Sequence, residues 1–304
     1  MTLVAEQVLN GLQFGVMIFL LAAGLTLVFG IMGVINLAHG SVYMLGAFAA
    51  AAASANGAPF VLAVAAGVAA AAVAGVLIEL IVIRRLYARN HLDQVLATFA
   101  LILIANDGVS IVWGKTPLQM KLPPALETAW HLGPITYPSY RVVILIAGLA
   151  VALGLAAVLR WTRFGMLVRA ASTHGDVVGA LGISVAPLKT AVFTLGAVLA
   201  GAAGGLLAPL LSVQAGMGEQ ILVMTFVAII VGGLGSVRGA FAGAILVGLV
   251  DTLGRAFVPA LLRPLVAPDV ANALAGGIAA VSIYLLLAVV LIVRPRGLFP
   301  VGAA

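Results

Sequence analysis

The stretch LNGLQFGVMIFLLAAGLTLVFGIMG, residues 9–33, decides the fold because it runs for 25 residues without an Asp, Glu, Lys or Arg. A helix needs about 20 apolar residues to cross the roughly 30 Å hydrocarbon core of a bilayer. Further apolar stretches follow at 36–55, 59–83, 94–113, 140–159, 189–212, 220–235, 239–257 and 271–293. The sequence therefore predicts an all-α, polytopic membrane helix bundle of about eight or nine transmembrane helices, forming a single domain over residues 1–304.

The composition excludes a water-soluble domain. Hydrophobic residues make up 64% of the 304 residues and charged residues only 8%, whereas a soluble domain carries roughly 25% charged residues. There is no cysteine, so a disulfide framework, a thiolate metal site and a cysteine nucleophile are excluded. The net charge of +6 is spread too thinly for nucleic-acid binding, which needs clustered basic residues.

Two connections between the predicted spans are very short. Almost no loop separates the spans that end at 33 and begin at 36, and only Gly235–Gly239 divides the segment 220–257. Such breaks are either tight hairpins or discontinuous helices that line a cavity, because unpaired backbone at membrane depth is tolerated only inside protein or beside water. Nine full spans and eight spans with a re-entrant segment both remain open.

The basic residues predict the orientation of the chain. With nine crossings and the N-terminus outside, ten of the 15 Lys and Arg residues fall on the inner side and five on the outer side. This is the direction of the positive-inside rule, and it places the C-terminus inside. The inner group is Arg84, Arg85, Arg89, Arg160, Arg163, Arg169, Lys189, Arg238, Arg294 and Arg296, and the outer group is Lys115, Lys121, Arg141, Arg255 and Arg263.

Motifs of common catalytic and nucleotide-binding sites are absent from the sequence. There is no Gly-x-x-x-x-Gly-Lys-Ser/Thr phosphate loop, no His-Glu-x-x-His zinc pair and no Gly-x-Ser-x-Gly elbow. The four histidines are scattered, so no metal site is expected, and no spacing nominates a nucleophile with its base. We expect the chain not to be an enzyme, although an intramembrane enzyme stays as a formal alternative.

Few ionisable groups lie inside the predicted spans. Glu79 and Asp251 each have an arginine about one turn further on, so a local ion pair is the simplest interpretation of both. The pair Asn106-Asp107 either lines a pathway or belongs to a buried hydrogen-bond network. A proton- or sodium-coupled carrier usually needs carboxylates at mid-membrane. A stand-alone secondary transporter or channel is therefore the weaker hypothesis.

The segment Ile35–Tyr43 is the most suggestive polar stretch. It follows a span directly, and Asn36 and Ser41 are residue types that begin helices. Either it is an interfacial hairpin, or a broken helix here directs its N-terminal dipole into the bundle. We take as substrate-pathway candidates Asn36, His39, Ser41, Asn106 and Asp107.

Small residues recur at a spacing of four in several spans. This spacing puts them on one helix face, where neighbouring backbones approach closely. Tight packing alone is the simplest explanation for most of them. The series are Gly11 with Gly15, Gly201 with Gly205, and Gly235 with Gly239 and Gly243.

Three motifs carry a resemblance to a known family. The stretch GLTLVFGIMGVINLAHGS, residues 24–41, resembles the N-terminal signature of the branched-chain amino acid permeases, the H-type subunit of the Liv system. The stretches GGLGSVRGA, residues 232–240, and RPRGLF, residues 294–299, are similar to later motifs of the family. The family often has Pro where this chain has Arg238. The last motif is shared with the sister M-type subunit and with urea permeases.

The resemblance implies a division of labour within an ATP-binding cassette importer. A periplasmic protein captures the substrate, this chain and a sister permease subunit (M-type) form the pathway, and two cytoplasmic ATPases bind ATP and Mg²⁺; a homodimer of this chain is the alternative to the pair with the sister subunit. The chain itself then needs no cofactor. The expected location is the bacterial inner membrane. Branched-chain amino acids are the expected substrates, with urea, short amides and aromatic acids as alternatives.

The resemblance also marks a coupling segment in the longest inner loop, 160–188. Its residues are similar to the Glu-Ala-Ala…Gly coupling motif of bacterial importers, with arginine where glutamate is usual. A short helix here would dock on the ATPase and transmit its closure as a rigid-body motion. Without the resemblance, the segment is an ordinary solvated loop. The expected coupling residues are Arg169, Ala170, Ala171, Gly182 and Ile183.

Overall fold

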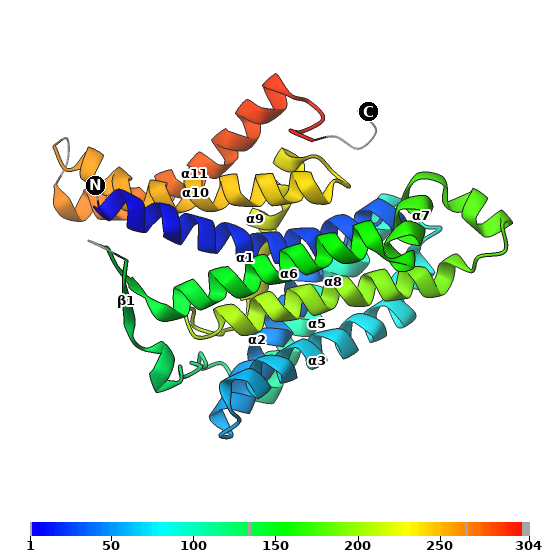
Figure 1. The fold of residues 1–304 in the computed structure, drawn as a ribbon, viewed down its shortest axis with the longest axis horizontal. Coiled ribbons are helices and arrows are strands. Elements are labelled where there is room, and N and C mark those ends of the chain that lie inside the picture. The colour runs from blue at the N-terminus through cyan, green and yellow to red at the C-terminus, as the bar shows by residue number, and fades with distance from the viewer. Residues whose placement is uncertain (1, 133–134, 265–266, 300–304) are drawn as a thin grey trace. The chain divides into compact units, whose positions relative to one another are not determined.

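The computed structural model describes residues 2–132, 135–264 and 267–299, and most of them are helical (Figure 1). The predicted all-α polytopic bundle is confirmed, since these ranges contain eleven α-helices. Seven helices are long and apolar enough to cross a membrane. They are α1 (Thr2–Met32), α3 with its continuation (Phe60–Leu86), α5 (His91–Trp113), α6 (Ser139–Trp161), α8 (Val185–Leu207), α10 (Val237–Leu262) and α11 (Pro268–Val293).

The two remaining predicted spans are shorter helices. Helix α2 (His39–Ala55) has 17 residues and α9 (Met217–Gly232) has 16. At about 1.5 Å per residue each is roughly 24–26 Å long, less than the roughly 30 Å of a bilayer core. Both begin inside protein, because His39 is 2% and Met217 is 7% exposed. Of the two interpretations of the break before α2, the structure favours a discontinuous helix over an interfacial hairpin.

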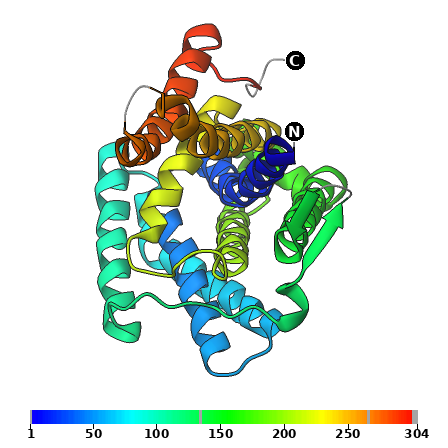
Figure 2. The same ribbon diagram turned by 90° about the vertical axis from the view of Figure 1, so that its left-hand side faces the viewer.

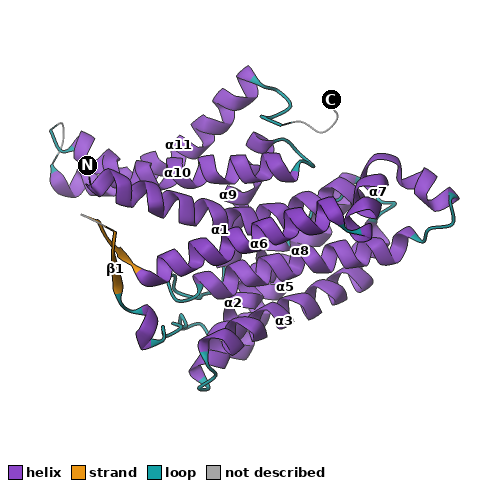
Figure 3. Cartoon of the chain, viewed as in Figure 1, coloured by secondary structure: helices purple, strands orange, loops and turns teal. Residues whose placement is uncertain are grey.

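The other elements lie between the long helices. Helix α3 proper (Phe60–Ile78) continues through a π-helical turn (Glu79–Ile83) into the short α4 (Arg84–Leu86). A 3-10 turn (Pro124–Leu126) precedes the antiparallel hairpin of β1 (Ala129–Leu132) and β2 (Ile135–Pro138), in which Trp130 faces Tyr137. Figure 3 shows that these are the only strands in the described part of the chain. Helix α7 (Arg163–Ala180) precedes α8.

The chain divides into two compact units that alternate along the sequence. The first unit comprises Met1–Ala22, Pro124–Leu149 and Met224–Ala304, and the second comprises Ala23–Pro123 and Ala150–Val223. Helices α1, α6 and α9 therefore contribute residues to both units.

Small residues hold the second unit together. Helices α2, α3 and α8 pack against one another (Figure 2). A Cβ on Gly46 would lie 2.7 Å from the Gly201 Cα, and a Cβ on Gly204 would lie 2.3 Å from the Tyr43 carbonyl oxygen. Real Cβ atoms do not approach this closely, so glycine lets these backbones touch.

The first unit uses the same device. The start of α1 packs on α10, where a Cβ on Gly15 would lie 2.8 Å from the Ile245 Cα and one on Gly248 would lie 2.5 Å from the Gly15 nitrogen. Gly239 similarly meets Gly232 across the turn between α9 and α10. Most glycines of the series recognised in the sequence therefore serve close helix packing. The exceptions are Gly205, where a Cβ would meet its neighbours no closer than 3.4 Å, and Gly235, which has a φ of +83° in the turn itself.

Candidate functional site

The break between α1 and α2 is the first part of the candidate site. Residues 33–38 are not helical, yet Val34, Asn36 and Ala38 are each 0% exposed. Asn36 organises the break, because its Oδ1 accepts the Ala38 N–H at 3.0 Å and its carbonyl accepts the His39 N–H at 3.4 Å. Non-helical backbone is thus buried in protein, the setting in which a membrane protein tolerates it.

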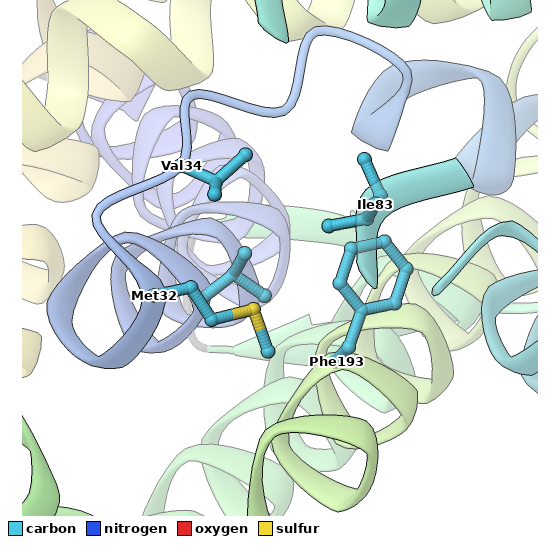
Figure 4. Close-up of a cluster of buried hydrophobic side chains, with 5 residues drawn as sticks. Met32, Val34, Ile83 and Phe193 are labelled. Carbon is cyan, nitrogen blue, oxygen red and sulfur yellow. The ribbon is translucent and has the colours of Figure 1, made fainter. Parts of the chain in front are cut away.

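A cluster of apolar side chains packs beneath this break. Figure 4 shows Met32 and Val34 on one side, facing Ile83 and Phe193 on the other. Val28 completes the cluster, and all five side chains are at most 9% exposed.

The start of α9 is the second part of the site. The Asn106 side chain of α5 donates from Nδ2 to Glu219 Oε1, and its Oδ1 accepts the Gly216 N–H at 3.1 Å. Glu219 lies in the first turn of α9, where a carboxylate stabilises the positive end of the helix dipole. Asn106 therefore fixes where α9 begins, which supports the hydrogen-bond interpretation of this residue.

The first turns of α2 and α9 meet. A Cβ on Gly40 would lie 2.2 Å from the Gly218 carbonyl oxygen, and one on Gly218 would lie 2.4 Å from the Gly40 carbonyl oxygen. Gly24 of α1 and Gly196 of α8 are in similar contact beside the His39 ring. We call this meeting point of the two first turns the α2–α9 junction. Four of the predicted pathway residues lie at or next to this junction. His39 and Ser41 flank Gly40, Asn36 accepts the His39 N–H, and Asn106 bonds to Glu219 beside Gly218.

The junction carries polar atoms without a hydrogen bond. Within the described residues, the buried atoms Asn36 Nδ2 and Glu219 Oε2 have no partner, and neither do Thr26 Oγ1 on α1 and Tyr43 Oη on α2. The first turn of α2 adds backbone N–H groups at Gly40 and Ser41, which have no intrahelical acceptor. The two helix starts that meet at the junction thus carry an unused carboxylate oxygen and an unused amide donor, groups that suit a small ligand with both charges.

Asp107 does not join this site. It is exposed on α5, whereas the neighbouring Asn106 is half-buried and points at the start of α9. Consecutive residues of a helix point about 100° apart, so the two side chains that we took together face different surroundings.

Sequence reasoning missed Glu219. The predicted span began at residue 220, so Glu219 was assigned to the preceding loop and was not weighed among the carboxylates of the spans. The glycines on its N-terminal side, Gly216 and Gly218, were a usable signal, because small residues permit close approach of backbone at a helix start.

A second polar cluster ties α3 to α8. Glu79 is 0% exposed, and its oxygens accept from Arg84 Nε and Nη2 at 3.2 Å each, from Tyr87 Oη at 2.8 Å and from Thr190 Oγ1 at 2.9 Å. Burial and the hydrogen bond to Glu79 raise the pKa of Tyr87 above its usual range, so the phenol stays a neutral donor. The expected local pair of Glu79 with Arg84 is present, but it also reaches α8 through Thr190.

Asp251 has the local partner expected for it. Arg255 Nε lies 2.9 Å from Oδ1 and 3.0 Å from Oδ2, one turn along α10.

The predicted coupling segment forms α7 and the turn after it. Thr162 caps the helix by accepting the Gly165 N–H at 3.1 Å, and Gly182 has a φ of +81° beyond its end. Arg169 and Ala170 are exposed, Ala171 is buried, and Gly182 and Ile183 are exposed. One face of α7 leaves apolar groups uncovered, with Met166 and Val177 each 55% and Leu181 73% exposed.

Two of the motifs noted in the sequence meet in the first unit. The Leu298 N–H donates to the Val231 carbonyl and the Phe299 N–H donates to the Gly232 carbonyl, each at 2.9 Å. The last carbonyls of a helix lack intrahelical donors, so the C-terminal motif caps α9. A Cβ on Gly297 would lie 2.6 Å from the Gly233 backbone, and one on Gly233 would lie 2.9 Å from the Phe299 carbonyl oxygen.

Within the described residues no group of three or more His, Asp or Glu side chains is placed to hold a metal ion.

Comparison with known proteins gives one consistent family. The sequence profile described as "Branched-chain amino acid transport system / permease component" matches residues 7–293. The high-affinity branched-chain amino acid transport system permease protein LivH of Escherichia coli K12 is 27% identical over 314 residues, covering 96% of this chain and 94% of LivH. No solved structure matches the chain.

Two further relatives have the same kind of name. BraD of Pseudomonas aeruginosa, a high-affinity branched-chain amino acid transport system permease protein, is 28% identical and covers 82% of this chain and 85% of its own. A probable branched-chain amino acid transport permease protein LivH of Methanocaldococcus jannaschii is 29% identical and covers 82% of this chain and 80% of its own.

Proposed function

Because the chain belongs to the family of permease components of branched-chain amino acid transport systems, we propose that it carries leucine, isoleucine and valine across the membrane. It is a multi-pass membrane permease, and its family is a transport subunit rather than a catalyst. The observation that carries the proposal is the family match over residues 7–293. The buried α2–α9 junction supports it, since broken helices with free polar groups are typical of substrate sites in transporters.

The energy comes from partner chains. We place the protein in an ATP-binding cassette importer with a sister permease subunit, two cytoplasmic ATPases that hold ATP and Mg²⁺, and a periplasmic substrate-binding protein. The N-terminus is periplasmic and the C-terminus cytoplasmic in this assembly, in a bacterial inner membrane. The bias of ten inner to five outer basic residues supports the orientation.

Helix α7 transmits the movement of the closing ATPases to the helices of the substrate pathway. The exposed apolar face at Met166, Val177 and Leu181 suits a protein partner rather than water. Helix α7 leads directly into α8, which Thr190 anchors to Glu79 and Arg84 of the α3 end. Helix α8 also packs on α2. A rigid movement of α7 is therefore passed to the helix that begins at the junction.

Reconstitution of the five-chain complex in proteoliposomes tests this function. With ATP inside, we expect uptake of labelled leucine, isoleucine and valine that is lost when this chain is omitted. Competition by urea, a short amide and phenylalanine identifies the other substrates considered. Uptake by this chain alone in an ion gradient, or uptake by the remaining partners without it, would contradict the proposal.

A further inference from the structure

Glu219 presents one free carboxylate oxygen at the α2–α9 junction. Its Oε1 is used by Asn106, whereas Oε2 is buried and has no hydrogen-bond partner in the described part of the chain. Both carboxylate oxygens of Glu79, by contrast, accept hydrogen bonds from Arg84, Tyr87 or Thr190. Glu79 is fully buried and Glu219 half-buried, and the two carboxyl groups differ in that Glu219 retains a buried, unused acceptor oxygen.

Within the described ranges, no Lys or Arg side chain forms an ion pair with Glu219. Among the described residues the ion pairs are Arg84 with Glu79 and Arg255 with Asp251. A carboxylate inside a membrane protein is costly unless it is paired, solvated or used in function. Because the first turn of α9 and Asn106 satisfy only one side of Glu219, the unpaired oxygen is a place for a cation from outside the chain.

The opposite side of the junction suits a carboxylate. Asn36 is 0% exposed, its Oδ1 is held by the Ala38 N–H, and its Nδ2 is left as a free donor at the start of α2. The N–H groups in the first turn of that helix add a positive dipole end, which favours anions. Gly40 and Gly218 bring the two first turns into contact, with Glu219 directly after Gly218 and Asn36 four residues before Gly40.

We propose that Glu219 receives the α-ammonium group of the translocated amino acid, while Asn36 and the first turn of α2 receive its α-carboxylate. This inference rests on the proposed function and names the groups that recognise the zwitterion. The Gly40–Gly218 contact is too close to admit a ligand, so the ligand enters when the two first turns separate during the cycle. The side chain of the amino acid makes no charged contact, which leaves its discrimination to other groups.

The test uses the complete reconstituted complex with a Glu219→Gln variant. Glutamine keeps an oxygen for the Asn106 hydrogen bond but removes the charge. We expect leucine uptake to fall by about ten-fold or more, because the variant loses one charge-assisted hydrogen bond to the substrate. Co-purification with the partner chains should match the wild type, because glutamine keeps the hydrogen bond with Asn106 that fixes the start of α9. Glu219→Asp should retain more uptake than Glu219→Gln.

The control is Glu127→Gln, which changes an exposed carboxylate on a loop and should transport normally.

Several outcomes would overturn the inference. Uptake by Glu219→Gln equal to wild type would show that the charge is not used, and Glu219→Asp as inactive as Glu219→Gln would show that charge at this position does not determine uptake. A Gln variant that no longer co-purifies with its partners would make Glu219 a structural group. If wild-type uptake disappears when choline replaces sodium, the Glu219 carboxylate binds a metal cation instead of the α-ammonium group. If the wild-type complex itself takes up no amino acid, the proposed function fails instead.

Discussion

At the scale of single residues, Glu79 and Glu219 of the second unit illustrate two uses of a membrane carboxylate. Glu79 is 0% exposed and receives donors on both oxygens from Arg84, Tyr87 and Thr190. Such full satisfaction is what a structural carboxylate requires, since the cost of burial falls when every acceptor site is filled. Glu219 has one free oxygen, so it has the unfilled capacity that a ligand site requires.

Substituting Glu79→Gln should destabilise the protein. The change leaves the Arg84 guanidinium without its counter-charge and turns one acceptor oxygen of the cluster into a donor group that faces Thr190 or Tyr87. We expect a loss of about 1.5–3 kcal/mol, the range for hydrogen bonds to a charged group, seen as a lower thermal unfolding midpoint in detergent. Glu127→Gln, on an exposed loop, is the control, and equal midpoints for both variants would show that the cluster adds nothing.

At the scale of elements, the short helices α2 and α9 are positioned by glycine. Gly40 and Gly218 face each other with no room for a methyl group, and the atoms in the way belong to the backbone. Backbone cannot rotate aside as a side chain can, so a larger residue must separate the helices.

Gly40→Ala should hold the α2–α9 junction apart. The added Cβ would lie 2.2 Å from the Gly218 carbonyl oxygen, so the closed arrangement described here becomes strained. We expect strongly reduced uptake in the reconstituted complex with normal insertion into the membrane. Gly108→Ala is the matched control on α5, because a Cβ there meets nothing within 4 Å. Normal transport by Gly40→Ala would mean that close contact at the junction is not needed in the cycle.

The exposed face of α7 should be needed for ATPase attachment. Met166 and Val177 lie eleven residues apart, close to three helical turns, and so share one face. Val177→Asp places a charge in this apolar face, where Val177 is 55% exposed and its loss costs little internal packing. We expect the ATPases to co-purify poorly with this variant. Ser172→Asp adds the same charge to another exposed position of α7 and should bind them normally; equal recovery with both variants would argue against docking on this face.

At the scale of the whole molecule, the chain alternates between two units and has no cysteine. A single introduced cysteine is therefore the only thiol, and its labelling from one side of the membrane reports the orientation directly. Lys121 lies in the predicted outer loop and Ser172 on α7, and both are exposed.

Lys121→Cys should react in intact cells with a thiol reagent that does not cross the inner membrane, and Ser172→Cys should react only after the membrane is opened. The expectation follows from the excess of basic residues assigned to the inner side. Labelling of Ser172→Cys in intact cells, with Lys121→Cys protected, would reverse the proposed orientation. Transport by both variants shows that the labelled proteins are functional.

Much of the fold was predictable because membrane insertion depends on local composition. Each apolar stretch is judged by its own length and charge, so the positions of the nine helical segments followed from the sequence. The π-helical turn at Glu79–Ile83 and the unequal lengths of α2 and α9 did not follow, since apolar runs look alike whether they cross a bilayer or stop inside it.

The sequence by itself determined that this is an α-helical membrane permease, and it pointed to Asn36, His39, Ser41 and Asn106 as polar residues in unusual places. Only the tertiary structure decided which of them meet. Asn106 reaches Glu219 across 113 positions of sequence and Thr190 reaches Glu79 across 111. Such pairs depend on how helices pack in three dimensions, through backbone contacts such as that of Gly40 with Gly218. The pattern of apolar residues along one helix does not specify which other helix packs against it.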